Sequence, residues 1–232
     1  MLTKIGIIGS SGFLGKTLCK ISKNYEYDIV EISKNNYDDQ KSKTFDILIN
    51  SATPSKKFWA SKNPYLDFQK TVKLTADITY NWEYDKLIQI SSISAGDDNL
   101  HHPYAINKKT AELITTYKNH LIVRLGTLYG EGLVKGALFD MLNSKQIYVD
   151  ANSKFDFIST TFISNWIFKN LEKKGLVELG ACDTLSLLEI AENLKLNIRA
   201  SGKLIEISSP RIEPDMPSAK DVLEFANYFN KS

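Results

Sequence analysis

The sequence predicts an α/β fold built on a doubly wound parallel sheet. Short apolar runs alternate with stretches whose apolar residues recur at helical spacing, and a glycine-rich turn follows the first run. The chain has 232 residues, of which 43% are hydrophobic and 24% charged, as in ordinary soluble globular proteins. We therefore expect one sizeable core rather than two large independent domains.

The first half of the chain supplies most of the predicted sheet. A strand at 4–9 leads through glycines into a helix at about 16–21. The next elements are expected in the order strand 28–32, strand 45–50, helix 64–80, strand 86–90, helix 104–118 and strand 120–125. The polar connection between 32 and 45 is too short for a full crossover helix. Strands that alternate with helices in this way form a parallel sheet with helices on both faces.

The regular alternation fades after Tyr129. The stretch 130–165 mixes apolar patches with glycines and polar turns, and we expect irregular structure there. A strand near 176–180 follows, and then a helix that begins at Ser186 with Glu189 at the capping-box position. The predicted organisation is a sheet domain over 1–129, completed by the strand near 176–180, and a substrate-binding lobe over 130–232 that is not an independent domain.

Charge, hydropathy and cysteine content exclude several classes of protein. The 29 basic and 27 acidic residues give a net charge of +2, which does not indicate a nucleic-acid binder. No apolar run approaches the roughly 18 residues that cross a bilayer, and the N-terminus has no signal-peptide pattern, so we expect a cytoplasmic protein without membrane contact. Cys19 and Cys182 have no companion cysteines at metal-ligand spacing, so we expect two small buried side chains, no disulfide and no metal site.

The turn after the first strand reads GSSGFLG, with glycines at 9, 12 and 15. Gly9 permits a tight turn, Gly12 is expected to let a pyrophosphate approach through a backbone conformation open to glycine alone, and Gly15 lets helix and strand pack closely. The helix N-terminus adds free N–H groups for a phosphate. The position of this turn therefore predicts a dinucleotide site. Its expected cofactor contacts are Gly9, Ser11, Gly12, Phe13, Leu14 and Gly15.

A serine, a tyrosine and a lysine form the candidate catalytic set. Tyr104 and Lys108 lie one turn apart on a predicted helix, and Ser92 lies where the strand 86–90 ends, at the carboxyl edge of the sheet. The same spacing occurs at Tyr37 and Lys41, but in a polar connection without a serine partner. An ammonium and an oxidised nicotinamide favour the phenolate, so Tyr104 can exchange a proton with a substrate hydroxyl. Lys108 would also hold the nicotinamide ribose, and Ser92 would hydrogen-bond the substrate oxygen.

Seven stretches then occur in an order typical of one family. They are GIIGSSGFLG (6–15), DILINSA (46–52), NPYLDF (63–68), LIQISSIS (87–94), PYAINKKTAE (103–112), VRLGTLYGEG (123–132) and LVELGACDTLSLLEIAENL (176–194). The chain resembles the extended short-chain dehydrogenase/reductases, the NAD-dependent epimerase/dehydratase family that acts on nucleotide sugars. The resemblance implies a Rossmann-like fold, an NAD or NADP cofactor and Ser92, Tyr104 and Lys108 as catalytic residues, with Ala52 lining the cofactor channel.

The chain departs from the family pattern in ways that limit which of the family's reactions the resemblance implies. The connections 32–45 and 92–104 are short, and Thr71 stands near the place where the family commonly has an Asn that supports the active-site helix. Ile93 and Ser94 replace the Asp-Glu pair of the dehydratases, so water elimination is disfavoured. A 4-keto reductase or a 4-epimerase of a nucleotide-linked sugar is implied. The alternative is a non-catalytic dinucleotide-binding sensor, but a pure binder has no need of Tyr104.

Cofactor preference depends on the end of the second strand. Proteins specific for NAD usually place an acidic residue there, to accept hydrogen bonds from the adenosine ribose. Here Ser33 and Lys34 follow the strand 28–32, so we expect NADP to bind at least as well as NAD. If the strand ends two residues earlier, Glu31 becomes the ribose acceptor and the preference reverses.

Other polar residues have weaker functional interpretations. Tyr129 is expected to touch the sugar, and Arg211 to grip a substrate diphosphate. Ser91 is the alternative candidate for the catalytic role assigned to Ser92. His101 and His102 are expected to be exposed loop residues rather than metal ligands. The predicted partner is a nucleotide-sugar substrate, and a homodimer stays open.

Overall fold

The computed structural model describes residues 2–96, 100–209 and 213–229. Its contacts divide the chain into two compact units. The first unit holds Met1–Arg124 and Ser164–Val177, and the second holds Leu125–Ile163 and Glu178–Ser232. The stretch 164–177 therefore packs with the first unit. The substrate-binding role expected of the C-terminal part stays a prediction.

A six-stranded sheet forms the centre of the fold. Its strands, in spatial order, are β2 (Asp28–Ile32), β1 (Lys4–Ile8), β3 (Thr44–Asn50), β4 (Glu83–Ser92), β5 (His120–Leu125) and β9 (Gly175–Leu179). The pairs β1–β2, β1–β3 and β3–β4 are parallel. From β1 the chain crosses to one side for β2 and to the other for β3, which confirms the predicted doubly wound sheet.

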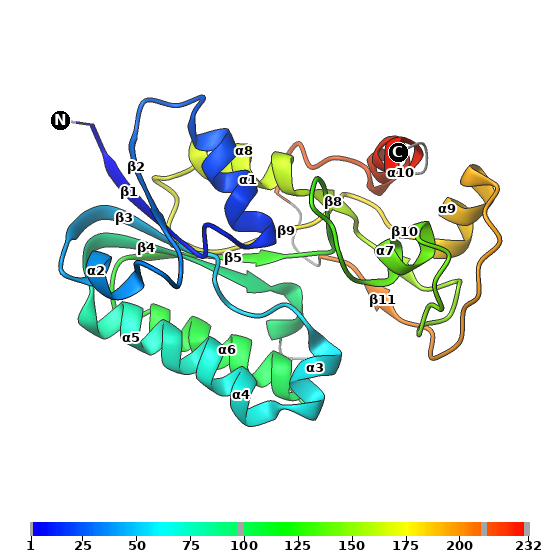
Figure 1. The fold of residues 1–232 in the computed structure, drawn as a ribbon, viewed down its shortest axis with the longest axis horizontal. Helices are drawn as coiled ribbons and strands as arrows, with labels where there is room; N and C mark the ends of the chain where they lie inside the picture. Colours follow the sequence, from blue (N-terminus) through cyan, green and yellow to red (C-terminus); the bar gives the residue numbers. More distant parts are fainter. Residues whose placement is uncertain (1, 97–99, 210–212, 230–232) are drawn as a thin grey trace. The chain divides into compact units, whose positions relative to one another are not determined.

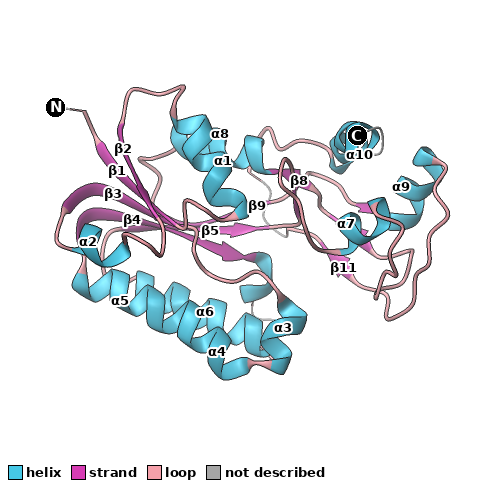
Figure 2. Ribbon diagram, viewed as in Figure 1, coloured by secondary structure: helices cyan, strands magenta, loops and turns pink. Residues whose placement is uncertain are grey.

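Helices cover both faces of the sheet. They are α1 (Phe13–Ser22), α2 (Tyr37–Lys41), α3 (Lys57–Lys62), α4 (Pro64–Phe68), η1 (Gln69–Lys73), α5 (Leu74–Asn81), η2 (Ile93–Ala95), α6 (Pro103–Thr115) and α8 (Thr160–Lys169). In Figure 1, α5 and α6 lie along one face and α1 and α8 along the other, and Figure 2 shows the same layers by element type. Apolar side chains between the sheet and α5 form one core cluster, made of Ile8, Ile32, Phe45, Leu48, Ile78, Trp82, Tyr84 and Leu87.

The observed elements differ from the expected ones in two ways. The helix predicted over 64–80 is a run of α4, η1 and α5, with a π-helical segment in its middle. The connection between β2 and β3 holds only the five-residue α2, which confirms that it is too short for a full crossover helix. The helix α8 begins inside the stretch expected to be irregular, and that expectation was wrong there. The sequence signal for this helix was the spacing of Ile163 and Ile167, which lie one turn apart and are fully buried.

The second unit contains small sheets and short helices. Its elements are β6 (Leu128–Tyr129), α7 (Ala137–Leu142), β7 (Lys154–Phe155), β8 (Ile158–Ser159), β10 (Leu185–Ser186), α9 (Leu187–Leu194), β11 (Glu206–Ile207), η4 (Ala219–Asp221) and α10 (Val222–Phe229). One sheet has the order β10-β7-β11 and the other pairs β6 with β8. The predicted capping box at the start of α9 is confirmed, because the backbone N–H groups of Ser186 and Glu189 each donate to the other's side chain.

Two further sequence expectations concern burial and membranes. Cys19 is buried, as expected, but Cys182 is exposed, so the expectation of two buried cysteines was wrong for the second. Cys182 lies in the loop between β9 and β10, where the short connection keeps its side chain at the surface. None of the described helices is both long enough and apolar enough to cross a membrane.

A buried carboxylate lies in the second unit. Asp156 is fully buried, and its Oδ1 accepts a hydrogen bond of 3.0 Å from the Thr127 backbone N–H. Its Oδ2 has no hydrogen-bond partner among the described residues. Gly126 and Gly180 flank the carboxyl group so closely that a Cβ at either position would clash with it. Burial raises the pKa of Asp156 to about 7.

This raised pKa predicts a pH-dependent stability. The native state binds the Asp156 proton more tightly than the unfolded chain does. The stabilisation that this proton gives the native state is therefore complete below about pH 4 and is lost as the pH rises through about 7. We expect the free energy of unfolding to fall over that range by a few kcal/mol at most, and Asp156→Asn to remove the fall. Urea unfolding at pH 5, 6, 7 and 8 measures it, with the exposed Asp85→Asn as control. An unchanged pH slope in Asp156→Asn contradicts the assignment.

Candidate functional site

The glycine turn between β1 and α1 has the geometry of a phosphate cradle. Gly9 has a φ of +88°, and its N–H donates to the carbonyl oxygen of Ile32 in β2 at 2.8 Å. A Cβ at Gly15 would overlap the Gly9 carbonyl group, so helix and strand need glycine there. The first turn of α1 begins with Phe13 and Leu14, whose N–H groups lie at the positive end of the helix dipole. This turn therefore fits an anionic pyrophosphate.

Gly12 differs from the expectation made for it. It precedes α1 with a φ of −77° and a ψ of 172°, an extended conformation that any residue adopts, so the glycine-only backbone expected at Gly12 was wrong. The nearest atom to a Cβ at Gly12 would be the Gly9 carbonyl oxygen, at 3.1 Å. The backbone conformation therefore does not require glycine at this position.

The segment after β3 lies against the same turn. A Cβ at Gly9 would meet the backbone of Ala52 at 2.8 Å, so Ala52 and the glycine turn are in direct contact. Ser51 adds two hydrogen bonds to the Ile8 carbonyl oxygen, from its N–H at 2.9 Å and its hydroxyl at 2.8 Å. The carboxyl ends of β1 and β3 are where the strand order reverses, the usual ligand crevice of such sheets. The structure thus brings the predicted Ala52 beside Gly9.

The serine, tyrosine and lysine come together at the next strand end. Tyr104 lies in the first turn of α6, and the Lys108 Nζ is 5.5 Å from the centroid of its ring. The Lys108 ammonium also donates a hydrogen bond of 2.5 Å to the Thr53 hydroxyl. Ser92 ends β4, and its hydroxyl accepts a hydrogen bond from the Ser94 N–H at 3.3 Å. Thr53 was not predicted, although its position three residues after β3 was a usable signal.

The environment of Tyr104 controls its proton. Only 4% of the residue is exposed, and burial raises the pKa of its hydroxyl to about 12. The negative charge of Asp67 acts in the same direction, whereas a hydrogen bond with Ser92 lowers the pKa. In the protein alone, Tyr104 therefore carries its proton at neutral pH.

Ser91 has a structural role instead. Its buried hydroxyl donates to Glu112 Oε1 at 2.6 Å, and Glu112 accepts two more hydrogen bonds from Arg124, at 2.9 and 2.8 Å. Arg124 also donates to the Ala95 carbonyl oxygen at 3.2 Å. This network joins β4, α6 and β5 in a region with little solvent, where removing one charged partner is costly. Of the two candidate serines, Ser92 is the one beside Tyr104.

The start of α6 differs from the expectation for its histidines. His101 is exposed, as expected, but His102 is half-buried and caps the helix. The His102 Nδ1 accepts a hydrogen bond from the Tyr104 N–H at 3.2 Å, and its Nε2 lies 2.6 Å from the Ser61 hydroxyl. His102 therefore fixes the first turn that carries Tyr104. Among the described residues, no group of three or more His, Cys, Asp and Glu side chains is placed to hold a metal ion.

The end of β2 fits the longer of the two strand boundaries considered. The strand ends at Ile32, so Ser33 and Lys34 are the first residues beyond it, and Glu31 pairs with Ile7 inside the sheet. The Ser33 N–H donates to Asn36 Oδ1 at 2.8 Å, which closes a tight turn at this point. Glu31 lines a small cavity of about 210 Å³ together with residues of α1.

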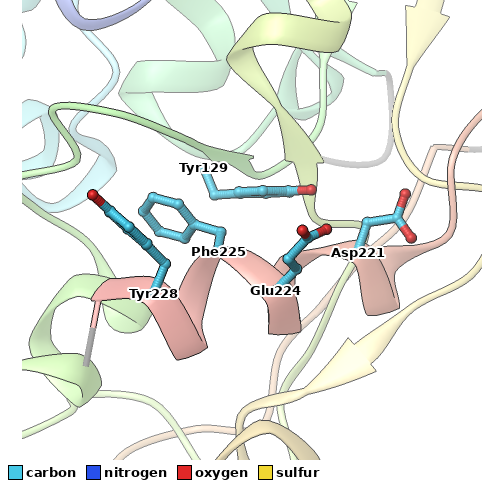
Figure 3. A pocket seen from close by; sticks show the side chains of 5 residues that line it. All are labelled: Tyr129, Asp221, Glu224, Phe225 and Tyr228. Carbon is cyan, nitrogen blue, oxygen red and sulfur yellow. The ribbon is translucent and has the colours of Figure 1, made fainter. Parts of the chain in front are cut away.

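Tyr129 lies in a pocket of the second unit. Its ring centroid is 5.4 Å from that of Phe225, and burial raises the pKa of its hydroxyl to about 12. The pocket measures about 460 Å³, and Figure 3 shows its lining by Tyr129, Asp221, Glu224, Phe225 and Tyr228. Aromatic rings and carboxylates thus face the same space. The other predicted substrate contact, Arg211, lies outside the described residues.

Comparison with known proteins identifies the fold. No model of a known protein family matches the chain, and no curated protein matches it. Solved structures do match. UDP-glucuronic acid 4-epimerase from Bacillus cereus, in complex with UDP-glucuronic acid and NAD, is 18% identical with a TM-score of 0.75, and the match covers 99% of both chains. dTDP-4-dehydrorhamnose reductase from Bacillus anthracis, in complex with NADP, is 19% identical with a TM-score of 0.78, and the match covers 98% of both. These similarities establish a Rossmann-like α/β fold.

Proposed function

We propose that the protein is an NAD(P)-dependent oxidoreductase or epimerase that acts on a nucleotide-linked sugar. The observation that carries the proposal is the buried Tyr104, with Lys108 and Ser92 around it, at the same sheet edge as the glycine turn. The similar structures support it, since they include a 4-epimerase with NAD and a 4-keto reductase with NADP. A non-catalytic dinucleotide sensor remains the alternative, and it has no use for a proton-transfer tyrosine.

Each residue of the site has a proposed role. The N–H groups at the start of α1 bind the pyrophosphate, with Gly12 leaving room for it. Lys108, oriented by Thr53, holds the nicotinamide ribose. A bound nicotinamide supplies or accepts a hydride at the sugar carbon. Ser92 donates a hydrogen bond to the sugar oxygen, and Tyr104 transfers the proton of that oxygen.

Tyr129 keeps its predicted role as a contact of the sugar, and the lining of its pocket suits a sugar ring. Aromatic faces pack on the apolar C–H face of a sugar ring, and carboxylates such as Asp221 and Glu224 accept hydrogen bonds from its hydroxyls. The same carboxylates repel a diphosphate, so the diphosphate belongs elsewhere. Arg211 keeps its predicted role toward the diphosphate. A cytoplasmic location and a homodimer also remain predictions.

Two measurements test this function. Native mass spectrometry of the purified protein shows whether a nicotinamide cofactor is retained, which favours an epimerase, or exchanges, which favours a reductase. Absorbance at 340 nm then follows reduction of dTDP-4-dehydrorhamnose, and chromatography of the products follows epimerisation of UDP-glucose and UDP-glucuronic acid, which consumes no cofactor overall. Binding of a cofactor without turnover of any nucleotide sugar favours the sensor.

We also expect NADP to bind at least as well as NAD. No carboxylate directly follows β2 to repel a 2′-phosphate, and Lys34 is placed to attract one. Lys34→Glu is expected to weaken NADP binding by about tenfold while NAD binding changes little. Isothermal titration of both cofactors at one ionic strength measures this, with Lys43→Glu, at the opposite end of β3, as the charge-matched control. A preference for NAD that Glu31→Ala abolishes contradicts the prediction.

A further inference from the structure

His102 links α3 to the first turn of α6 through both of its ring nitrogens. The Tyr104 backbone N–H donates to His102 Nδ1 at 3.2 Å, and His102 Nε2 lies 2.6 Å from the Ser61 hydroxyl oxygen. The Ser61 hydroxyl donates its own proton to the Lys57 carbonyl oxygen at 3.3 Å. An Nδ1 atom that accepts a hydrogen bond carries no proton, so the ring proton is on Nε2 and is donated to Ser61. The His102 ring therefore makes both contacts only in its neutral form.

The segment that contacts His102 also contacts the candidate catalytic lysine. Thr53, at the start of this segment, accepts a hydrogen bond of 2.5 Å from the Lys108 ammonium, and Ser61, near its end, contacts His102. The segment is thus joined to α6 at Lys108 and to the N-cap residue of that helix, two residues before Tyr104. The position of Tyr104 therefore depends on the contact at His102 as well as on that at Lys108.

The surroundings of His102 keep its ring neutral. Burial is the strongest effect that disfavours a second proton on the ring, and the charges of Lys57 in α3 and of the adjacent His101 act in the same direction. Asp67 of α4 acts in the opposite direction. The net effect holds the pKa of His102 below its usual value of 6.5. At pH 7 the ring is therefore in the form that its two hydrogen bonds require.

We propose that His102 is a positioning residue for Tyr104, and that a second proton on its ring releases the first turn of α6 and lowers activity in acid. This proposal rests on the function proposed above. A protonated Nδ1 is a donor, so it cannot accept from the Tyr104 N–H, and the bond between them is lost. Loss of an N-terminal cap destabilises the first turn of a helix, and Tyr104 lies in that turn. The site therefore keeps its geometry only while the ring is neutral.

NMR of the full chain tests this link without any substrate. The chain has three histidines, so the ring nitrogens of ¹⁵N-labelled protein are assigned by elimination with His101→Asn and His120→Asn. We expect His102 to carry its proton on Nε2 at pH 7 and to gain a second proton below pH 6.5. The Tyr104 amide resonance, assigned with Tyr104→Phe, is expected to shift with the same midpoint, because the amide loses its acceptor there.

Variants separate the titration of the ring from the cap that it provides. With the substrate found by the measurements above, wild-type kcat is expected to fall about fivefold from about pH 7.5 to about pH 5, as for the loss of one N-terminal cap. His102→Asn supplies a capping side chain that does not titrate, so its kcat, relative to its own value at the higher pH, is expected to stay level. His102→Ala has no cap at any pH and is expected to be slow throughout.

A second histidine variant provides the control. His120→Asn removes a histidine at the amino end of β5, away from α3 and from the start of α6, and is expected to keep the wild-type pH profile of kcat. Asp156, whose pKa of about 7 lies in the same range, is present in all four proteins. A difference between their profiles therefore belongs to His102.

Two results would overturn the proposal. One is a Tyr104 amide resonance that does not follow the His102 titration, and the other is a loss of kcat in acid that is as large in His102→Asn as in the wild type. The NMR titration uses the wild-type ring, so it decides the link even if a His102 variant does not fold. Failure of the proposed function looks different, because Tyr104→Phe would then retain turnover whatever the NMR titration shows.

Discussion

Tyr104→Phe is expected to lower kcat on the true nucleotide sugar by a hundredfold to ten-thousandfold. The variant loses the hydroxyl that exchanges a proton with the sugar oxygen, and a positioned acid–base group contributes about that much. The phenyl ring still fills the same buried space under Lys108, so the cofactor Kd and the thermal unfolding temperature are expected to stay close to wild type. Initial rates, followed at 340 nm for a reductase or by chromatography of the sugar product for an epimerase, give kcat, and cofactor titration gives Kd.

The chain offers a matched control for this experiment. Tyr37 and Lys41 have the same sequence spacing, but they face Asp77 rather than the sheet edge of the candidate site. Tyr37→Phe removes a hydroxyl of the same kind, and we expect it to leave kcat unchanged. Equal turnover in Tyr104→Phe and wild type would refute the catalytic assignment of Tyr104 and favour the non-catalytic alternative.

Gly12→Val is expected to weaken dinucleotide binding by at least a thousandfold in a folded protein. Gly12 has an extended backbone that valine adopts, and a Cβ there approaches one carbonyl oxygen at 3.1 Å, a contact that small adjustments relieve. The branched side chain then occupies the space above the first turn of α1, where the pyrophosphate would lie. Fluorescence titration with NADPH measures the loss, and circular dichroism checks the fold.

Gly15→Ala provides the contrasting case. Its Cβ would overlap the Gly9 carbonyl group, so this variant is expected to lose stability as well as cofactor binding. The two variants therefore distinguish the role proposed for Gly12, which is to leave space for a ligand, from that of Gly15, which is to let the helix and strand pack. Wild-type cofactor affinity in folded Gly12→Val would show that the turn has a purely structural role.

Local signals predicted the fold and the placement of the site residues. The GSSGFLG turn and the capping box of Ser186 and Glu189 depend on residues close together in sequence, and both formed where predicted. The arrangement of Ser92, Tyr104 and Lys108 also followed, because consecutive parallel strands end at one edge of a sheet.

Long-range burial explains what sequence reasoning missed. Asp67 reads as an ordinary helix-surface carboxylate, and only the packing of α4 on α6 buries it completely. The π-helical η1 interrupts a run whose apolar spacing is uniformly helical, so no local pattern marked it. Whether Glu31 or Ser33 takes the ribose-contact position depended on where β2 ends, to within two residues. Hydrogen bonds to β1 decide that boundary, and composition does not.

The order of strands has a consequence for how the chain folds during synthesis. β5 ends at Leu125, whereas its neighbour β9 begins only at Gly175, so the whole intervening segment must leave the ribosome before the sheet is complete. Until then β5 presents an unpaired edge, and such edges template association with other chains. Closing so long a loop also carries an entropy cost that slows folding. The nascent chain is therefore most exposed to aggregation between the emergence of β5 and that of β9, which is the interval in which a chaperone would be of most use.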